Sequence, residues 1–169
     1  MKVLATIGAL AVLVAVAAGV FFFGGFYSVA GTAEEPSIVK WALIQIRSAS
    51  IDRHATDKPP AAFADPSSVQ AGARIFARIG CVYCHGGPGV NWAKFSEGLH
   101  PEPADLKDAA NNRTPEQLFW AVKNGVNMTG MPSFAGAGAT DEDIWKIVAF
   151  LKKLPAVSDA DFKAWTTMP

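Results

Sequence analysis

An uninterrupted apolar stretch opens the chain, from Val3 to Phe23, and contains no charged residue. As a helix at 1.5 Å per residue it would be about 31 Å long, which is enough to cross the hydrocarbon core of a bilayer. Small residues at 28–30 and 31–33 would also suit cleavage of a signal peptide, but the run exceeds the roughly 7–15 residues of a signal core. The pattern therefore favours a retained transmembrane anchor over residues 1–33, and either interpretation exports the rest of the chain.

Residues 34–54 mix apolar with polar and charged side chains, and this pattern predicts a helix that begins near Ser37, whose hydroxyl can cap the first turn. Apolar side chains recur along one face and cations lie near both ends, which is typical of an amphipathic helix with Trp41 at headgroup depth. Three placements are open: in the membrane interface, on a partner subunit, or over the next domain. The apolar positions are Val39, Leu43, Ile44 and Ile46, and the cations are Lys40, Arg47 and Arg53.

Residues 55–65 are rich in Pro and Ala, a composition that forms a semi-rigid linker. Beyond the linker, apolar stripes with the period of a helix predict three main helices in a domain over residues 66–157. No segment alternates as a β-strand does, so the expected fold class is all-α. A short helix is expected in the tail at residues 158–169. The expected capping pairs are Ser67 with Gln70, Thr114 with Gln117 and Thr140 with Asp143.

The charges of the chain are balanced. The formal net charge is zero, and residues 66–169 carry ten Lys and Arg against ten Asp and Glu. No basic field for nucleic acid follows from this composition, and strong electrostatic steering of a charged partner is not indicated.

Residues 81–85 read Cys-Val-Tyr-Cys-His and contain the only two cysteines of the chain. Cys-x-x-Cys-His is the attachment signature of c-type haem, in which two thiols add to the vinyl groups of one porphyrin and the adjacent histidine binds the iron. The sequence therefore predicts one covalently attached haem c, held by Cys81 and Cys84, with His85 as an iron ligand. The porphyrin would also supply apolar surface to a domain of about 90 residues, whose own core is modest.

Three other uses of a Cys-x-x-Cys pair fit the sequence less well. A thioredoxin-like dithiol needs a βαβ context, whereas the segments around Cys81 look helical. A structural zinc site needs two more ligands at matched spacing, and the other histidines, His54 and His100, are not paired. A disulfide between residues so close together would constrain little chain.

A Thr129–Pro132 loop of sequence Thr-Gly-Met-Pro can present the thioether of Met131 to the other face of the iron. A soft sulfur ligand opposite histidine favours ferrous haem and raises the potential. Taken alone, Met131 is better explained as a core residue that fills a gap. Met128 and His100 are the alternative ligands.

The order of these features resembles the class I cytochrome c family and looks most like its bacterial membrane-anchored mono-haem members, over roughly residues 66–157. The resemblance implies a cytochrome c-like haem domain with His85 and Met131 as axial ligands of the iron. The features that carry it are Gly72 and Phe76, the motif at residues 81–85, Pro103–Leu106, Thr129–Pro132 and Trp145 in the last helix.

The same resemblance implies how the domain packs and how the histidine is held. The first and last helices should cross with Gly72 and Phe76 against Trp145 or Phe150, and the missing side chain of a glycine allows close approach. In the family a proline carbonyl usually accepts a hydrogen bond from the second ring nitrogen of the histidine. The candidates for that role in this chain are Pro88, Pro101 and Pro103.

Together these features predict a membrane-tethered protein that carries single electrons and is not itself an enzyme. Lys2 ahead of the apolar run favours an N-terminus in the cytoplasm, and hence a single-pass protein of the inner membrane with its haem domain in the periplasm or cell exterior. The expected partners are membrane redox complexes or a periplasmic donor or acceptor, with no small-molecule substrate. The chain would act as a mobile carrier or as a permanent subunit of a respiratory or photosynthetic complex. The alternative is a haem-based sensor or enzyme with an open sixth coordination site.

Overall fold

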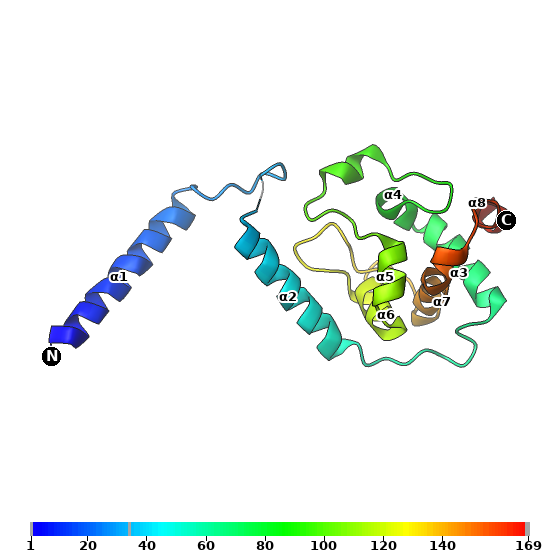
Figure 1. The fold of residues 1–169 in the computed structure, drawn as a ribbon, viewed down its shortest axis with the longest axis horizontal. Helices are drawn as coiled ribbons and strands as arrows, with labels where there is room; N and C mark the ends of the chain where they lie inside the picture. The colour runs from blue at the N-terminus through cyan, green and yellow to red at the C-terminus, as the bar shows by residue number, and fades with distance from the viewer. Residues whose placement is uncertain (1, 34, 168–169) are drawn as a thin grey trace. The chain divides into compact units, whose positions relative to one another are not determined.

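The structure is a computed structural model that describes residues 2–33 and 35–167. The chain divides into two compact units, Met1–Glu34 and Glu35–Pro169. The first unit contains α1 (Lys2–Phe23), blue in Figure 1, and none of the residues of this helix is buried. Within the described residues α1 is the single helix long and apolar enough to cross a membrane, and a signal sequence would meet the same criterion.

The second unit is built from helices, with no strand among the described residues and one isolated bridge between Gly87 and Val90. The prediction of an all-α fold is therefore confirmed. Its helices are α2 (Ser37–His54), α3 (Pro66–Arg78), α4 (Cys81–His85), the 3-10 helix η1 (Lys94–Gly98), α5 (Leu106–Asn112), α6 (Pro115–Asn124), α7 (Asp141–Lys153), the 3-10 helix η2 (Leu154–Ala156) and α8 (Asp159–Thr167).

The core of the second unit forms where α3 crosses α7, the helix pair with the most extensive contact. Gly72 lies against the backbone of α7: a Cβ built at this position would lie 1.9 Å from the carbonyl oxygen of Lys146. One turn further along α3, the Phe76 ring packs against Phe150 at 5.3 Å between centroids. The predicted crossing at Gly72 and Phe76 is confirmed, with Phe150 as the aromatic partner on α7.

Stacked aromatic rings attach α6 and α8 to the same core. Phe119 of α6 lies 4.1 Å from Trp145 of α7, with only 13° between the ring planes. Phe162 of α8 is 2% exposed and stacks on Phe150 at 5.6 Å. Both contacts bury large apolar rings, which provide most of the favourable free energy in a core of this size.

Two of the three predicted capping boxes are confirmed. The hydroxyls of Thr114 and Thr140 each accept a hydrogen bond from the third residue of their helix, and the side chain of that third residue bonds back to the cap. The prediction for Ser67 is wrong, because α3 begins two residues earlier than a cap at Ser67 implies, with Pro66 in its first turn and Asp65 as N-cap. The fixed φ of proline suits the first helical position, so Ser67 lies inside the helix.

The predicted helix after the anchor region begins at Ser37 and continues to His54, with Pro36 rather than Ser37 at the N-cap position. Its C-terminal half packs on α6: Ile51 is buried, and the Asp52 carboxylate accepts a hydrogen bond from the Gln117 amide at 2.6 Å. The Arg113 guanidinium lies 3.8 Å from the same carboxylate. This half of α2 therefore covers the domain, one of the three placements left open by the sequence.

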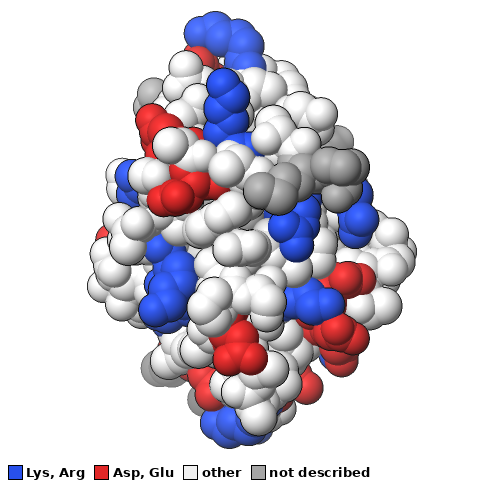
Figure 2. Space-filling view, turned by 90° about the vertical axis from the view of Figure 1, so that its right-hand side faces the viewer, with Lys and Arg blue, Asp and Glu red and all other residues white. Residues whose placement is uncertain are grey.

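Charged side chains of both signs are interspersed on the face of the molecule in Figure 2, without a field of one sign. This distribution agrees with the balanced composition of the chain. A partner that binds this face would gain little from long-range electrostatic attraction.

We expect Gly72→Ala to destabilise the second unit, because the new methyl group would overlap the α7 backbone at Lys146. Overpacking of this kind costs about 1–3 kcal/mol, and more where the neighbour is backbone. Denaturant unfolding of the full chain measures the loss. Gly98→Ala is the matched control, because a Cβ there meets nothing within 4 Å; equal stability of the two variants would contradict the proposed close helix contact.

Candidate haem-attachment site

The residues of the Cys-x-x-Cys-His motif form the separate short helix α4. Gly80, with φ of +93°, ends α3 and redirects the chain, and Gly86, with φ of +65°, ends α4. Because residues three and four apart lie on the same side of a helix, α4 presents Cys81, Cys84 and His85 close together. Both cysteines are free thiols, with Cys81 buried and Cys84 half-buried.

His85 is held in one orientation by a backbone carbonyl. Its Nδ1 lies 2.9 Å from the Ala104 oxygen, and because a carbonyl only accepts, Nδ1 carries the proton and donates. Burial lowers the pKa of His85, while the hydrogen bond to Ala104 opposes this shift. The ring is therefore neutral near pH 7 and leaves Nε2 with a free lone pair, the form that binds a metal.

The prediction of a proline carbonyl in this role is wrong. The acceptor is Ala104, one residue after Pro103, and neither Pro88 nor Pro101 takes part. Ala104 lies directly before Asp105, the N-cap of α5. The position of the carbonyl is therefore determined by the start of a helix rather than by the rigidity of a proline ring.

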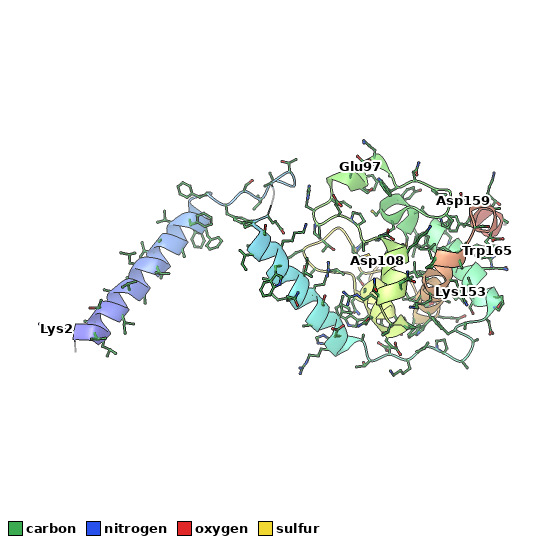
Figure 3. All side chains as sticks on the ribbon, in the orientation of Figure 1. Lys2, Glu97, Asp108, Lys153, Asp159 and Trp165 are labelled. Atoms are coloured by element: carbon green, nitrogen blue, oxygen red, sulfur yellow. The ribbon has the colours of Figure 1, made fainter. Side chains whose placement is uncertain are left out.

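A cavity of about 500 Å³ lies beside Cys84 and His85. This volume falls in the range of about 300–1,000 Å³ that is usual for sites of small molecules and cofactors. Apolar and acidic side chains line it together, among them Trp92, Leu106 and Leu154, with Glu97 and Glu102. Figure 3 labels Glu97 on η1 and Asp108 on α5, the two segments that flank the cavity.

The donor atoms at this site fit haem c, the cofactor that the motif predicts. Two free thiols lie on one side of a short helix, and Cys84 and the neutral His85 ring border a space lined by both apolar and charged side chains. Burial raises the pKa of the Cys81 thiol to about 12, so this thiol is uncharged and suits an apolar environment. The side chains therefore fit a porphyrin with iron at its centre.

Met131 lies outside this cavity and lines a second space of about 410 Å³. Two hydrogen bonds of the Met131 backbone hold its loop: the N–H donates to the Thr129 side-chain hydroxyl at 3.1 Å, and the carbonyl accepts from the Val126 N–H at 3.1 Å. A Cβ built at Gly130 would lie 3.1 Å from the Leu99 side chain. The methionine loop thus contacts the segment that follows η1, although Met131 and His85 do not share a cavity.

The two alternative ligands named from the sequence are both exposed. Met128 is 75% exposed and has a φ of +59°, and His100 lies at the surface. Met131, by contrast, is half-buried and packs against the core. The geometry therefore favours Met131 over Met128 and His100 as a residue that could reach the interior of the domain.

Sequence reasoning missed the acceptor Ala104 and the contribution of Leu106 to the cavity. The sequence gives a local signal for the start of α5, because Asp105 before the apolar Leu106 is a typical helix start, but it gives none for the contact of the Ala104 carbonyl with His85. Trp92, which the sequence did not place at the site, also lines the cavity. Arg113 and Trp120 contact α2 rather than the cavity: Arg113 lies beside Asp52, and Trp120 stacks on His54 at 6.0 Å.

An all-α domain that presents a Cys-x-x-Cys-His helix beside a cavity has the features of a c-type cytochrome. The family model described as "Cytochrome C oxidase, cbb3-type, subunit III" matches residues 67–151, half of the chain, and the chain belongs to this family. The protein is thus a c-type cytochrome, for which the family implies covalently bound haem c with iron and indicates electron transfer rather than catalysis. No curated protein and no solved structure matched the chain.

Proposed function

We propose that this chain is a membrane-tethered, mono-haem cytochrome c that carries single electrons between membrane redox complexes. The observation that carries the proposal is the arrangement of Cys81, Cys84 and His85 on one short helix beside the cavity, with the His85 ring held by Ala104. When bound, haem iron supplies the chemistry, a reversible one-electron change.

The residues of the site have distinct roles in this proposal. Cys81 and Cys84 hold the cofactor covalently, so that it stays in place in both oxidation states. His85 would bind the iron through Nε2, because Nδ1 is occupied by its hydrogen bond to Ala104. Met131 would supply the other iron ligand, from a loop whose backbone is held by Thr129 and Val126. If both residues stayed bound in both oxidation states, little of the protein would need to reorganise during electron transfer.

The membrane tether in this proposal is α1, retained as a single span with the second unit in the periplasm or cell exterior. Its length and apolar composition support this role. A tether raises the effective concentration of the domain near membrane partners, so that efficient transfer does not need a tight interface. The balanced charges support the same arrangement, since a chain with a net charge of zero does not attract a distant charged partner strongly.

The N-terminal half of α2 is the part of the second unit that we assign to the membrane interface. Ile38, Trp41 and Ile46 are 68%, 59% and 65% exposed, whereas the C-terminal half packs on α6. The 13 residues at 24–36 that join α1 to α2 extend to at most about 45 Å. A span through α1 therefore keeps this apolar end within reach of the bilayer, where Trp41 and the neighbouring Lys40 suit the headgroup region.

An oxidised and reduced absorption spectrum tests the proposed ligands. Wild-type protein should be low-spin in both states and, when oxidised, should show the weak far-red band typical of sulfur bound to ferric iron. Met131→Ala should lose this band and have a lower potential, because the thioether ligand that favours ferrous iron is gone. Met128→Ala is the control and should match the wild type, since Met128 is exposed.

Two outcomes would contradict this assignment. An unchanged far-red band in Met131→Ala would place another side chain on the iron. A high-spin wild-type spectrum that shifts with carbon monoxide would mean an open sixth position, and the sensor or enzyme alternative would replace the electron carrier. The separation of Met131 from the His85 cavity is the observation that makes this second outcome worth testing.

The attachment assignment predicts that Cys84→Ala retains at most one thioether. Its haemochrome absorption should shift toward that of a haem with one vinyl group intact, because one thiol can saturate only one vinyl. Ser96→Ala serves as a control that changes a small side chain of the same cavity without removing a thiol. A haemochrome spectrum of Cys84→Ala identical to that of the wild type would refute the assignment.

The interfacial placement of α2 predicts a depth difference between two spin-labelled positions in full-length protein in lipid nanodiscs. Both native cysteines are consumed by the haem, so a label attaches only at Trp41→Cys or at Ala49→Cys, two exposed positions of this helix. At position 41 the label should be accessible to oxygen and shielded from a water-soluble nickel chelate, and at position 49 the reverse should hold. Water exposure at both positions would contradict the placement, and shielding from both reagents at position 41 would indicate a protein partner instead.

A further inference from the structure

A short series of bonded groups links Asp105 to the ring of His85. Asp105 is the N-cap of α5, and its Oδ1 accepts hydrogen bonds from the backbone N–H of Lys107 at 2.7 Å and of Asp108 at 3.1 Å. The carbonyl of the preceding residue, Ala104, accepts the hydrogen bond from His85 Nδ1 at 2.9 Å. That carbonyl and the Asp105 nitrogen belong to one planar peptide unit. Restraint of the Asp105 φ therefore also restrains the direction of the carbonyl.

The rest of α5 is fixed independently of this cap. The Lys152 ammonium donates hydrogen bonds to the carbonyls of Ala110 and, at 3.0 Å, of Arg113, which satisfies acceptors at the C-terminal end of the helix. Leu106 packs against the core, and Ala110 is buried. The body of α5 is thus anchored on α7, and the cap determines the conformation of its first turn.

We propose that Asp105 is a positioning residue for His85 and that it contributes to the potential of the cytochrome; this inference rests on the proposed role of His85 as iron ligand. The cap holds the Ala104 carbonyl against Nδ1–H. A hydrogen bond accepted at that position makes the imidazole a stronger donor through Nε2. A stronger donor stabilises ferric relative to ferrous iron and so lowers the potential. Loss of the cap should weaken the hydrogen bond and raise the potential.

The negative charge of Asp105 offers a competing explanation, because Asp105 also lines the cavity. Removal of a nearby negative charge would raise the potential as well. Asparagine separates the two effects, because it caps helices about as well as aspartate and carries no charge. Serine does the same with a smaller side chain.

The experiment compares Asp105→Ala, Asp105→Asn and Asp105→Ser in the full-length holoprotein. Redox titration measures the midpoint potential, and nitrogen-15 NMR of the reduced protein measures solvent exchange of the His85 Nδ1 proton. We expect a raised potential and faster exchange in Asp105→Ala, with both quantities unchanged in the Asn and Ser variants. Thr114→Ala is the control, since it removes a comparable cap from α6 and should leave both quantities unchanged.

Several results would overturn the inference. An equal rise of the potential in the Ala and Asn variants would assign the effect to the lost charge. A wild-type potential and exchange rate in the Ala variant would exclude the positioning role. If Asp105→Ala is not recovered with haem, the Asn and Ser variants distinguish the cap from the charge. Both variants should keep the wild-type potential. A higher potential in both would assign the effect to the lost charge. Failure of the proposed function is recognised separately, because wild-type protein itself would then lack covalently bound haem or a histidine ligand.

Discussion

The close contact between α3 and α7 at Gly72 is the constraint on which the site depends. Only Ile79 and Gly80 separate α3 from α4, so the direction of α3 determines where the Cys-x-x-Cys-His helix lies. The two backbones approach this closely because residue 72 has no side chain. The rings of Phe76 and Phe150 then pack one turn away and fix the rotation of the pair.

The opposite side of the site is anchored on the same helix. Lys152 of α7 holds the C-terminal end of α5, and the N-cap of α5, Asp105, directly follows the carbonyl that orients His85. Leu154, the first residue of η2 directly after α7, lines the cavity itself. Both the motif and the group that orients its histidine are thus positioned by contacts with α7. This explains how a domain with long irregular loops can hold the His85 ring in one orientation.

The elements that could be predicted from the sequence are those with local signals. Thr114 and Thr140 each form a capping box with the residue three positions further along the chain. Such a box depends only on residues within one helical turn. The prediction at Ser67 failed because Pro66 competes for the same turn and starts the helix earlier. The Gly72 crossing followed from the family resemblance, and the structure gives its physical reason in the close approach to the α7 backbone.

The parts of the site that could not be predicted depend on contacts between distant segments. Nothing in the chain after His85 indicated which of several carbonyls would reach the ring, because that segment is irregular and rich in proline. The answer depends on where α5 starts and on how α5 packs against α7. For Met131 the order of motifs suggested a ligand, but its distance from His85 depends on loop packing, and the structure places it in a separate space.

Mass spectrometry of the tryptic peptide that contains the motif tests the central claim most directly. Trypsin cleaves after Arg78 and Lys94 and releases residues 79–94, which include both cysteines and His85. The account predicts that this peptide from purified full-length protein carries the added mass of one haem. A peptide with two unmodified thiols, from protein made in cells that mature c-type cytochromes, would contradict the account.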